Sequence, residues 1–192
     1  WSVATLVREL LQDFLHHAGQ PVAAVPSGQL PSPALYVREE RRALASDLTR
    51  RYWQQLLTGA ELVQIDGLRP YEPAGEKGLI VHHVELPDGL GARVRRLARA
   101  HDLPVKALLL AAHCLTLRLF SDTRDITTGL VTGGRPEEAG AERITGLFLE
   151  TLPLRLDTQP RTWLDSAREV YKQERDSHPH RHYPLSAIQE DR

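Results

Sequence analysis

Residues 144–155 have the sequence Ile-Thr-Gly-Leu-Phe-Leu-Glu-Thr-Leu-Pro-Leu-Arg, and this stretch decides the fold class. Its leucines predict a strand over Leu147–Leu156, interrupted at Pro153, because proline has no N–H to donate to a sheet. Upstream, the β-branched run Asp125–Thr132 predicts a second strand, ended by Gly133-Gly134. A third strand is predicted over Leu79–Leu86.

Amphipathic segments alternate with these strands. Apolar residues spaced three and four apart predict a first helix that begins at Ser2, its expected N-cap, and ends before Gly19. Further helices are predicted over Ser46–Thr58, after an Asp88 N-cap, over Val105–Phe120, which should be buried on most sides, and over Thr162–Arg175. Residues 19–35 and 60–78 hold most of the prolines and are predicted to be irregular connections. The class is therefore α/β, with a mixed β-sheet flanked by helices.

The composition limits the kind of protein. The 192 residues have a formal net charge of -1, which gives no electrostatic reason to expect binding to nucleic acid or to a membrane surface. No run of apolar residues is long enough to span a bilayer, and the start of the chain lacks the pattern of a signal peptide, so a cytoplasmic location is expected. The chain has one cysteine and no methionine, and Arg greatly outnumbers Lys. We therefore expect an internal piece of a larger, bacterial protein.

Three stretches together resemble the condensation domains of nonribosomal peptide synthetases. The run from Asp125 to Arg135 is similar to a family strand that ends in Gly-Arg, and residues 144–155 resemble the family motif Ile-Gly-x-Phe-Val-Asn-Thr-Leu-x-x-Arg. His180-Arg-His-Tyr-Pro-Leu185 is similar to the family's His-Gln-Asp-Tyr-Pro-Phe. Tyr52-Trp53 and the residues after them fit a Tyr-Trp-x-x-x-Leu segment. The stretches occur in the family's order and cover essentially the whole chain.

The resemblance implies a two-lobed fold similar to chloramphenicol acetyltransferase. Residues 1–58 are then expected to be the end of the N-terminal lobe and a connection, and residues 59–192 an incomplete C-terminal lobe. The family's active-site motif, His-His-x-x-x-Asp-Gly, is commonly followed by Trp or Val and then Ser. Since the chain begins with Trp1-Ser2, the catalytic histidine is expected immediately upstream, and residues 1–192 alone are expected to be inactive.

The resemblance also implies an acyltransferase of natural-product (antibiotic) biosynthesis, working beside other synthetase domains. Donor and acceptor carrier proteins would deliver their substrates on 4'-phosphopantetheine arms, and the acceptor amine would attack the donor thioester to form an amide. No cofactor of the chain's own is implied. The alternatives are a catalytically inactive condensation-like domain that recruits a tailoring enzyme, a free-standing ester-forming enzyme, and heterocyclising or epimerising relatives.

Several residues acquire expected roles through the resemblance. Six are expected to bind substrate: Trp1, Ser2, Thr132, Glu150, Thr151 and Tyr183. Trp1 could equally pack between the lobes. Arg135 and Arg155, each flanked by apolar strand residues, are expected to form structural ion pairs.

Two departures from the family pattern stand out. Glu150 occupies a position where the family usually has Asn beside the active-site tunnel, and Arg181-His182 replaces Gln-Asp. Replacing an amide by a carboxylate removes two donors and adds charge, so Glu150 indicates either a changed acceptor or neutral drift. The Arg181-His182 exchange is interpreted as structural.

The remaining candidates have simpler interpretations. His82 and His83 alternate along a predicted strand, with one residue too many before Asp88 to match the catalytic motif. Alternating histidines at 178, 180 and 182 could suggest a metal site, but Pro179 and Pro184 argue against the regular strand it needs, so no metal is predicted. Cys114, within an apolar helix, is expected to be a core residue.

Overall fold

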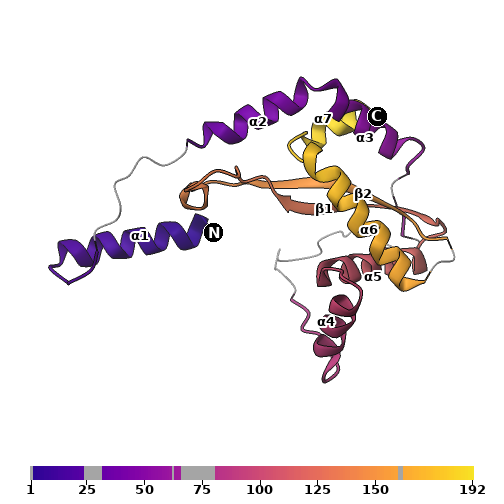
Figure 1. The fold of residues 1–192 in the computed structure, drawn as a ribbon, viewed down its shortest axis with the longest axis horizontal. Helices are drawn as coiled ribbons and strands as arrows, with labels where there is room; N and C mark the ends of the chain where they lie inside the picture. The colour runs from indigo at the N-terminus through magenta and orange to yellow at the C-terminus, as the bar shows by residue number, and fades with distance from the viewer. Residues whose placement is uncertain (1, 24–31, 62, 66–80, 160–161) are drawn as a thin grey trace, which may run out of the picture. The chain divides into compact units, whose positions relative to one another are not determined.

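The structure is a computed structural model that describes residues 2–23, 32–61, 63–65, 81–159 and 162–192 (Figure 1). Its elements are α1 (Ser2–His17), α2 (Ala34–Leu44), α3 (Asp47–Leu57), α4 (Leu90–Ala100), α5 (Val105–Leu119), β1 (Asp125–Gly133), β2 (Leu149–Asp157), α6 (Trp163–Ser177) and α7 (Leu185–Glu190). Short 3₁₀ turns lie at Ala141–Arg143 and His178–His180. Among the described residues, α1–α5 precede the two strands and α6 and α7 follow them, so the predicted alternation is wrong, while the α/β class holds as a small two-stranded sheet flanked by helices.

β1 and β2 form an antiparallel pair. The Thr158 N–H donates to the Arg124 carbonyl at 2.8 Å, and the Gly134 N–H donates to the Phe148 carbonyl at 2.7 Å. These two hydrogen-bonded pairs lie at opposite ends of the strands and fit one register, so the pairing is continuous between them. Pro153 falls opposite Gly129, between hydrogen-bonded positions, where its nitrogen faces away from β1. The predicted interruption at Pro153 is therefore wrong, and β2 continues through it.

The chain divides into two compact units. The first consists of Trp1–Thr58, Leu130–Leu152 and Pro179–Arg192, and the second of Gly59–Gly129 and Pro153–His178. One division between the units falls at Thr58–Gly59, and two later segments return to the first unit. Whether these units correspond to the two lobes of a condensation domain stays a prediction.

The first unit is organised around Trp53. This side chain is 1% exposed, and its Nε1 donates to the carbonyl of His180 at 3.3 Å, so α3 is fixed to the segment that precedes α7. Ser46 caps α3, its hydroxyl accepting from the Thr49 N–H as the sequence predicts. A second cluster joins Ala141, Ile144 and Phe148, with Tyr36 of α2 packed against it.

The second unit is built on α5. Ala107, Ala111 and Cys114 recur at helical spacing and are fully buried, and α5 packs against both α4 and α6. Lys106 pairs with Glu174 of α6, and Arg118 Nη1 donates to the Thr158 carbonyl at 2.6 Å. Leu109 and Leu119 are exposed, so the prediction that α5 is buried on most sides is wrong for its other face.

Three local predictions need correction. Residues 81–86 form no strand and are exposed, while residues 79 and 80 lie outside the described residues. Gly89, with φ of 71°, precedes α4 where Asp88 was the predicted N-cap, because only a residue that tolerates the left-handed region fits there. Helix α2 lies entirely outside the predicted helices.

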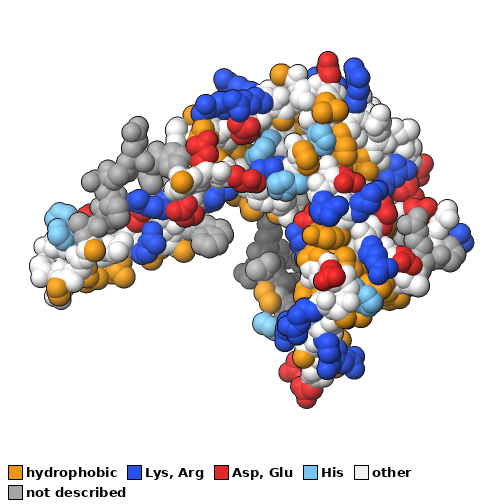
Figure 2. Space-filling view, viewed as in Figure 1, with side chains coloured by type: hydrophobic (Ala, Val, Ile, Leu, Met, Phe, Trp, Pro, Cys, Tyr) orange, Lys and Arg blue, Asp and Glu red, His pale blue; other side chains and the backbone are white. Residues whose placement is uncertain are grey.

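α1 forms over the predicted residues, but its apolar face is exposed. Val3, Val7, Leu10 and Phe14 all have most of their side-chain surface accessible, and Thr5 is the one buried residue of this helix. Figure 2 shows hydrophobic atoms along this helix. In the part of the chain that the structure describes, no helix has the length and apolar character needed to cross a bilayer.

Candidate functional site

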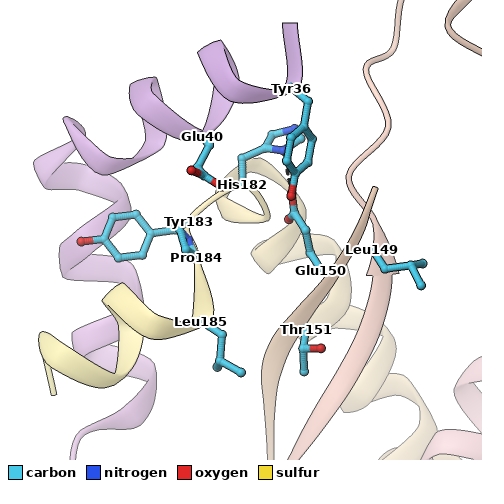
Figure 3. A pocket seen from close by; sticks show the side chains of 9 residues that line it. All are labelled: Tyr36, Glu40, Leu149, Glu150, Thr151, His182, Tyr183, Pro184 and Leu185. Atoms are coloured by element: carbon cyan, nitrogen blue, oxygen red, sulfur yellow. Dashed lines mark hydrogen bonds and ion pairs between the residues drawn. The ribbon is translucent and has the colours of Figure 1, made fainter. Parts of the chain in front are cut away.

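A pocket of about 220 Å³ lies in the first unit, where β2, α2 and the segment before α7 meet (Figure 3). β2 contributes Leu149, Glu150 and Thr151, and α2 contributes Tyr36 and Glu40. The segment before α7 contributes His182, Tyr183 and Pro184, and α7 contributes its first residue, Leu185. Two of the stretches that resemble the condensation family, residues 144–155 and 180–185, therefore meet at one pocket.

Glu150 and His182 form the polar centre of this pocket. His182 Nδ1 lies 3.0 Å from Glu150 Oε1, within the range of a charge-assisted hydrogen bond. The side chains are 12% and 11% exposed, respectively, so the contact is largely shielded from water. A carboxylate has only acceptors, so Nδ1 of His182 is the donor in this contact. The two departures from the family motifs thus contact each other.

Tyr36 lies beside the Glu150 carboxylate, with its hydroxyl directed toward it (Figure 3). Burial raises the pKa of the Tyr36 phenol to about 12, and the charge and hydrogen-bonding of Glu150 add to the effect. The ring of Tyr36 also makes edge contacts with Phe148 and His182, at centroid distances of 5.5 and 6.1 Å. Tyr36 therefore stays protonated at physiological pH and holds one wall of the pocket.

Close packing around Glu150 explains why residue 134 is a glycine. A Cβ at this position would come within 2.7 Å of Glu150 Cδ and 2.9 Å of Tyr36 Cε2, closer than real Cβ contacts. Gly134 also donates its N–H to Phe148 at the end of the strand pair. Only glycine lets the backbone approach the Glu150 side chain this closely.

Tyr183 was predicted to bind substrate, but its hydroxyl is turned away from the pocket (Figure 3). The side chain is 2% exposed, and its hydroxyl contacts Asp191 and lies 3.4 Å from Arg50 Nε. Burial is the main cause of the raised pKa of Tyr183, and Asp191 adds to it. Tyr183 therefore joins α3 to α7, and only part of it lines the pocket.

Ser2 and Arg135 contact each other. Ser2 Oγ donates to the Gly146 carbonyl at 2.7 Å and accepts from the Gly146 N–H and from Arg135 Nη2. Arg135 Nη1 donates to the carbonyls of Ala141 and Ile144, and the guanidinium stacks on the Phe148 ring at 4.5 Å. The Ser2 hydroxyl thus has its donor and both acceptor sites occupied, and Arg135 satisfies carbonyls where an ion pair was predicted.

The remaining predicted site residues differ in their relation to the pocket. Trp1 lies outside the described residues. By the strand register, Thr132 faces the same side of the pair as Glu150, and Thr151 faces the opposite side although it also lines the pocket. Arg155 is in the second unit, where its Nε and Nη2 contact both oxygens of Asp125 at 2.7 to 3.1 Å, the ion-paired arrangement expected for it.

Tyr36 and Glu40 of the pocket were not predicted from the sequence. Both belong to α2, where the short apolar run Ala34–Val37 is followed by charged residues. The available signals were the amphipathic character of this segment and the Glu39–Arg42 pair at helical spacing, 2.7 Å apart in the structure.

The clustered histidines of residues 178–182 form no strand. His180 stacks on Tyr52 with the rings 4.2 Å apart, and its Nδ1 lies 3.0 Å from Thr49 Oγ1. His180 and His182 therefore have separate protein partners, and no group of three metal-ligating side chains occurs among the described residues. His82 and His83 are exposed outside any strand or helix.

Cys114 is fully buried, as predicted. Burial raises the pKa of its thiol to about 11, which keeps it protonated and unreactive.

Comparison with known proteins identifies the family. The sequence model of the condensation domain matches residues 1–192, so the chain belongs to the condensation domain family. It is 40% identical to the AMB antimetabolite synthetase AmbE of Pseudomonas aeruginosa over 98% of this chain and 9% of that protein. It is 27% identical to malpibaldin synthetase of Mortierella alpina over 98% of this chain and 4% of that protein. The chain thus spans less than a tenth of the length of these relatives.

Solved structures share the fold. The first condensation domain of the calcium-dependent antibiotic synthetase, in complex with a substrate analogue, has a TM-score of 0.74 at 24% identity, covering 99% of this chain and 44% of that one. The X-domain from teicoplanin biosynthesis has a TM-score of 0.75 at 22% identity, again covering 99% and 44%. The chain thus shares the fold of these solved structures.

Proposed function

We propose that this chain is part of a condensation domain that forms an amide bond between two carrier-bound substrates in nonribosomal peptide biosynthesis. The donor is an acyl or aminoacyl thioester, and the acceptor is an aminoacyl group. Each would arrive on the phosphopantetheine arm of a peptidyl carrier protein, from neighbouring domains of the same synthetase. The observation that supports this most directly is the family match over all 192 residues, together with 40% identity to a synthetase.

Thioester chemistry suits a site of this kind. Because a thioester is already activated, holding the amine in line with it can supply much of the rate enhancement. A single base can assist the transfer of the amine proton. In the family this group is the histidine motif, expected upstream of Trp1, so residues 1–192 would contribute walls of the substrate channel and not the base.

The pocket around Glu150 is the place where this chain would contact a substrate. Residues of the two motif-like stretches line this pocket. Glu150, which was expected beside the tunnel, lies in it, and its Oε1 is 3.0 Å from His182 Nδ1. We place the acceptor side of the substrate channel at this pocket.

Reconstitution tests the proposal. The complete condensation domain that contains residues 1–192 would be mixed with a donor carrier bearing an acyl thioester and an acceptor carrier bearing an aminoacyl thioester, and the acceptor carrier analysed by mass spectrometry. We expect an acylated acceptor that requires both loaded carriers. The same assay with residues 1–192 alone should give no product.

The alternatives predict different outcomes. A recruitment domain would give no product with any cognate pair and would instead bind a tailoring enzyme tightly. An ester-forming enzyme would need a hydroxyl acceptor, and its product would be cleaved by mild base where an amide would survive. The residues preceding Trp1 supply an independent check, since a damaged His-His-x-x-x-Asp-Gly motif there would count against catalysis.

A further inference from the structure

The two ring nitrogens of His182 differ in their surroundings. Nδ1 lies 3.0 Å from Glu150 Oε1, while Nε2 has no hydrogen-bond partner among the described residues. Nε2 is not one of the buried side-chain atoms left without a partner, so it keeps accessible surface although the side chain as a whole is only 12% exposed. Because His182 lines the pocket, Nε2 is a polar atom that a ligand there can reach.

The Glu150 carboxylate determines which nitrogen of the neutral imidazole carries the proton. Its Oε1 contacts His182 Nδ1, its Oε2 is buried, and the Tyr36 hydroxyl hydrogen-bonds to the same carboxylate. Because a carboxylate offers only acceptors, it holds the imidazole proton on Nδ1. Nε2 of the neutral ring is then left with a lone pair and can accept a hydrogen bond from a ligand.

The rest of the pocket favours a particular ligand chemistry. Its lining includes a second carboxylate, Glu40, and contains no Lys or Arg among the described residues, so it suits a cation better than an anion. Leu149, Pro184 and Leu185 supply apolar surface beside this polar centre. A primary amine on a short carbon skeleton matches this combination of an acceptor nitrogen, negative charge and apolar walls.

We propose that His182 is a specificity-determining residue whose Nε2 accepts a hydrogen bond from the amino group of the acceptor substrate. This inference rests on the proposed function, in which the acceptor presents an amine. An ammonium N–H that donates to an imidazole nitrogen forms a charge-assisted hydrogen bond. The exchange at residue 182, interpreted from the sequence as structural, would then also affect ligand binding.

Glu150 is the positioning residue in this arrangement. It orients the imidazole through Nδ1, and the largely buried setting strengthens that contact. The Tyr36 ring makes an edge contact with the His182 ring at a centroid distance of 6.1 Å and restricts it from a second side. The imidazole is thus held by the protein before a ligand arrives, which reduces the entropy lost on binding.

A pair of stable probes tests the proposal in the complete condensation domain. The first is amino-pantetheine acylated with glycine, which presents a primary ammonium group. The second is amino-pantetheine acylated with N,N,N-trimethylglycine, which keeps the positive charge but has no N–H to donate. Isothermal titration calorimetry gives the ratio of their dissociation constants. We expect the wild-type domain to bind the glycyl probe about tenfold more tightly, the size expected for one charge-assisted hydrogen bond.

Substitutions then assign the preference to His182. His182→Asn keeps a side-chain donor for Glu150 but has no atom at the position of Nε2, so the preference should disappear. Glu137→Gln is the matched control and should keep the preference, because Glu137 is 70% exposed and contacts Arg181 outside the pocket.

NMR of the domain labelled with ¹⁵N-histidine observes the nitrogen directly. The Nε2 resonance of His182, assigned by its loss in His182→Asn, should have the chemical shift of an unprotonated imidazole nitrogen. It should move when the glycyl probe is added and stay in place with the trimethylglycyl probe. A residue with only a structural role would not distinguish the two probes.

The outcomes separate the two proposals. An equal affinity ratio in wild type and His182→Asn, or an Nε2 that is protonated in the wild-type domain, overturns the role of His182 even if the domain makes product. Failure to form product from loaded carriers, with the amine preference and the Nε2 response intact, overturns amide formation and leaves the amine site standing. Thermal unfolding shows whether His182→Asn is folded, and if it is not, the NMR response of wild type to the two probes decides.

Discussion

His182 Nδ1 lies 3.0 Å from Glu150 Oε1, and these are two positions at which the chain departs from the family motifs. Where the family pattern has Asn and Asp, the donor would be on the strand and the acceptor on the segment before α7. Here the carboxylate is on β2 and the donor is His182, so the direction of the hydrogen bond is reversed. We therefore expect the two exchanges to compensate each other.

This coupling predicts a double-mutant cycle. His182→Asp alone places two carboxylates together in a largely buried site and should lower the free energy of unfolding by roughly 3 kcal/mol. Glu150→Asn alone keeps an acceptor for His182 and should cost about 1 kcal/mol. The double variant restores an amide–carboxylate pair and should recover much of the loss.

Urea denaturation of the four proteins measures the cycle. We expect an interaction free energy of about 1–3 kcal/mol, with the double variant more stable than His182→Asp. Arg181→Gln, the neighbouring departure, is the control: it removes a contact with the exposed Glu137 and should not couple to position 150. Additive effects at 150 and 182 would contradict the compensation.

Gly134 gives a second prediction. Gly134→Ala forces a Cβ against Glu150 and Tyr36 and should lower the free energy of unfolding by about 1–3 kcal/mol, the cost of overpacking. Gly133→Ala is the matched control, because a Cβ there meets nothing within 4 Å, and it should change stability by less than about 0.5 kcal/mol. Chemical denaturation compares the two, and equal effects would show that the close approach to Glu150 does not matter.

The sequence predicted the parts of this fold that have strong local signals. α3 and α6 have a Ser or Thr N-cap followed by amphipathic spacing, and both helices begin within a residue of where the pattern places them. The positions of β1 and β2 followed from β-branched and leucine-rich runs. Pro153 misled the prediction, because only the register shows that its nitrogen faces away from the partner strand.

The candidate site was predictable only in part. Glu150 could be singled out because it breaks a family pattern, but its partner could not, since residues 150 and 182 meet through tertiary packing. Tyr36 lies in a short helix directly after the proline-rich connection, and nothing local in the sequence connects it with β2. Tyr183 shows the converse: a motif position suggested ligand binding, while packing directs its hydroxyl to Arg50 and Asp191.

The Arg155–Asp125 pair provides a third prediction, in the second unit. Two guanidinium nitrogens contact both carboxylate oxygens, and the side chains are 24% and 33% exposed, so geometry and partial burial both favour a measurable contribution. Arg155→Lys keeps the charge but loses the forked contact and should cost about 1 kcal/mol after screening by solvent.

Arg168→Lys is the control for that substitution. Arg168 makes a single contact with Asp165 at 3.3 Å and is 53% exposed, so the same exchange should have almost no effect on the urea midpoint. If both variants unfold at the wild-type midpoint, the bidentate geometry of Arg155 contributes nothing measurable.

His180 gives a pH-dependent prediction. Burial lowers the pKa of its imidazole below the ordinary value, so the unfolded chain binds this proton more readily than the folded one. Its contribution to stability is therefore complete above about pH 6.5 and is lost as the pH falls from there through the lowered pKa. The stacked Tyr52 ring and the Thr49 hydroxyl are its neighbours in the folded state.

Replacing His180 by Asn removes this titration. Wild type should be more stable than His180→Asn at pH 8, because the variant loses the stacking on Tyr52, and the difference in free energy of unfolding should narrow as the pH is lowered toward 5. Urea titrations at half-unit pH steps measure it. Gln55→Asn is the control, because Gln55 is exposed on α3 and has no titrating side chain, so its difference from wild type should show no such narrowing. Parallel curves for wild type and His180→Asn would mean that protonation of His180 is not linked to folding.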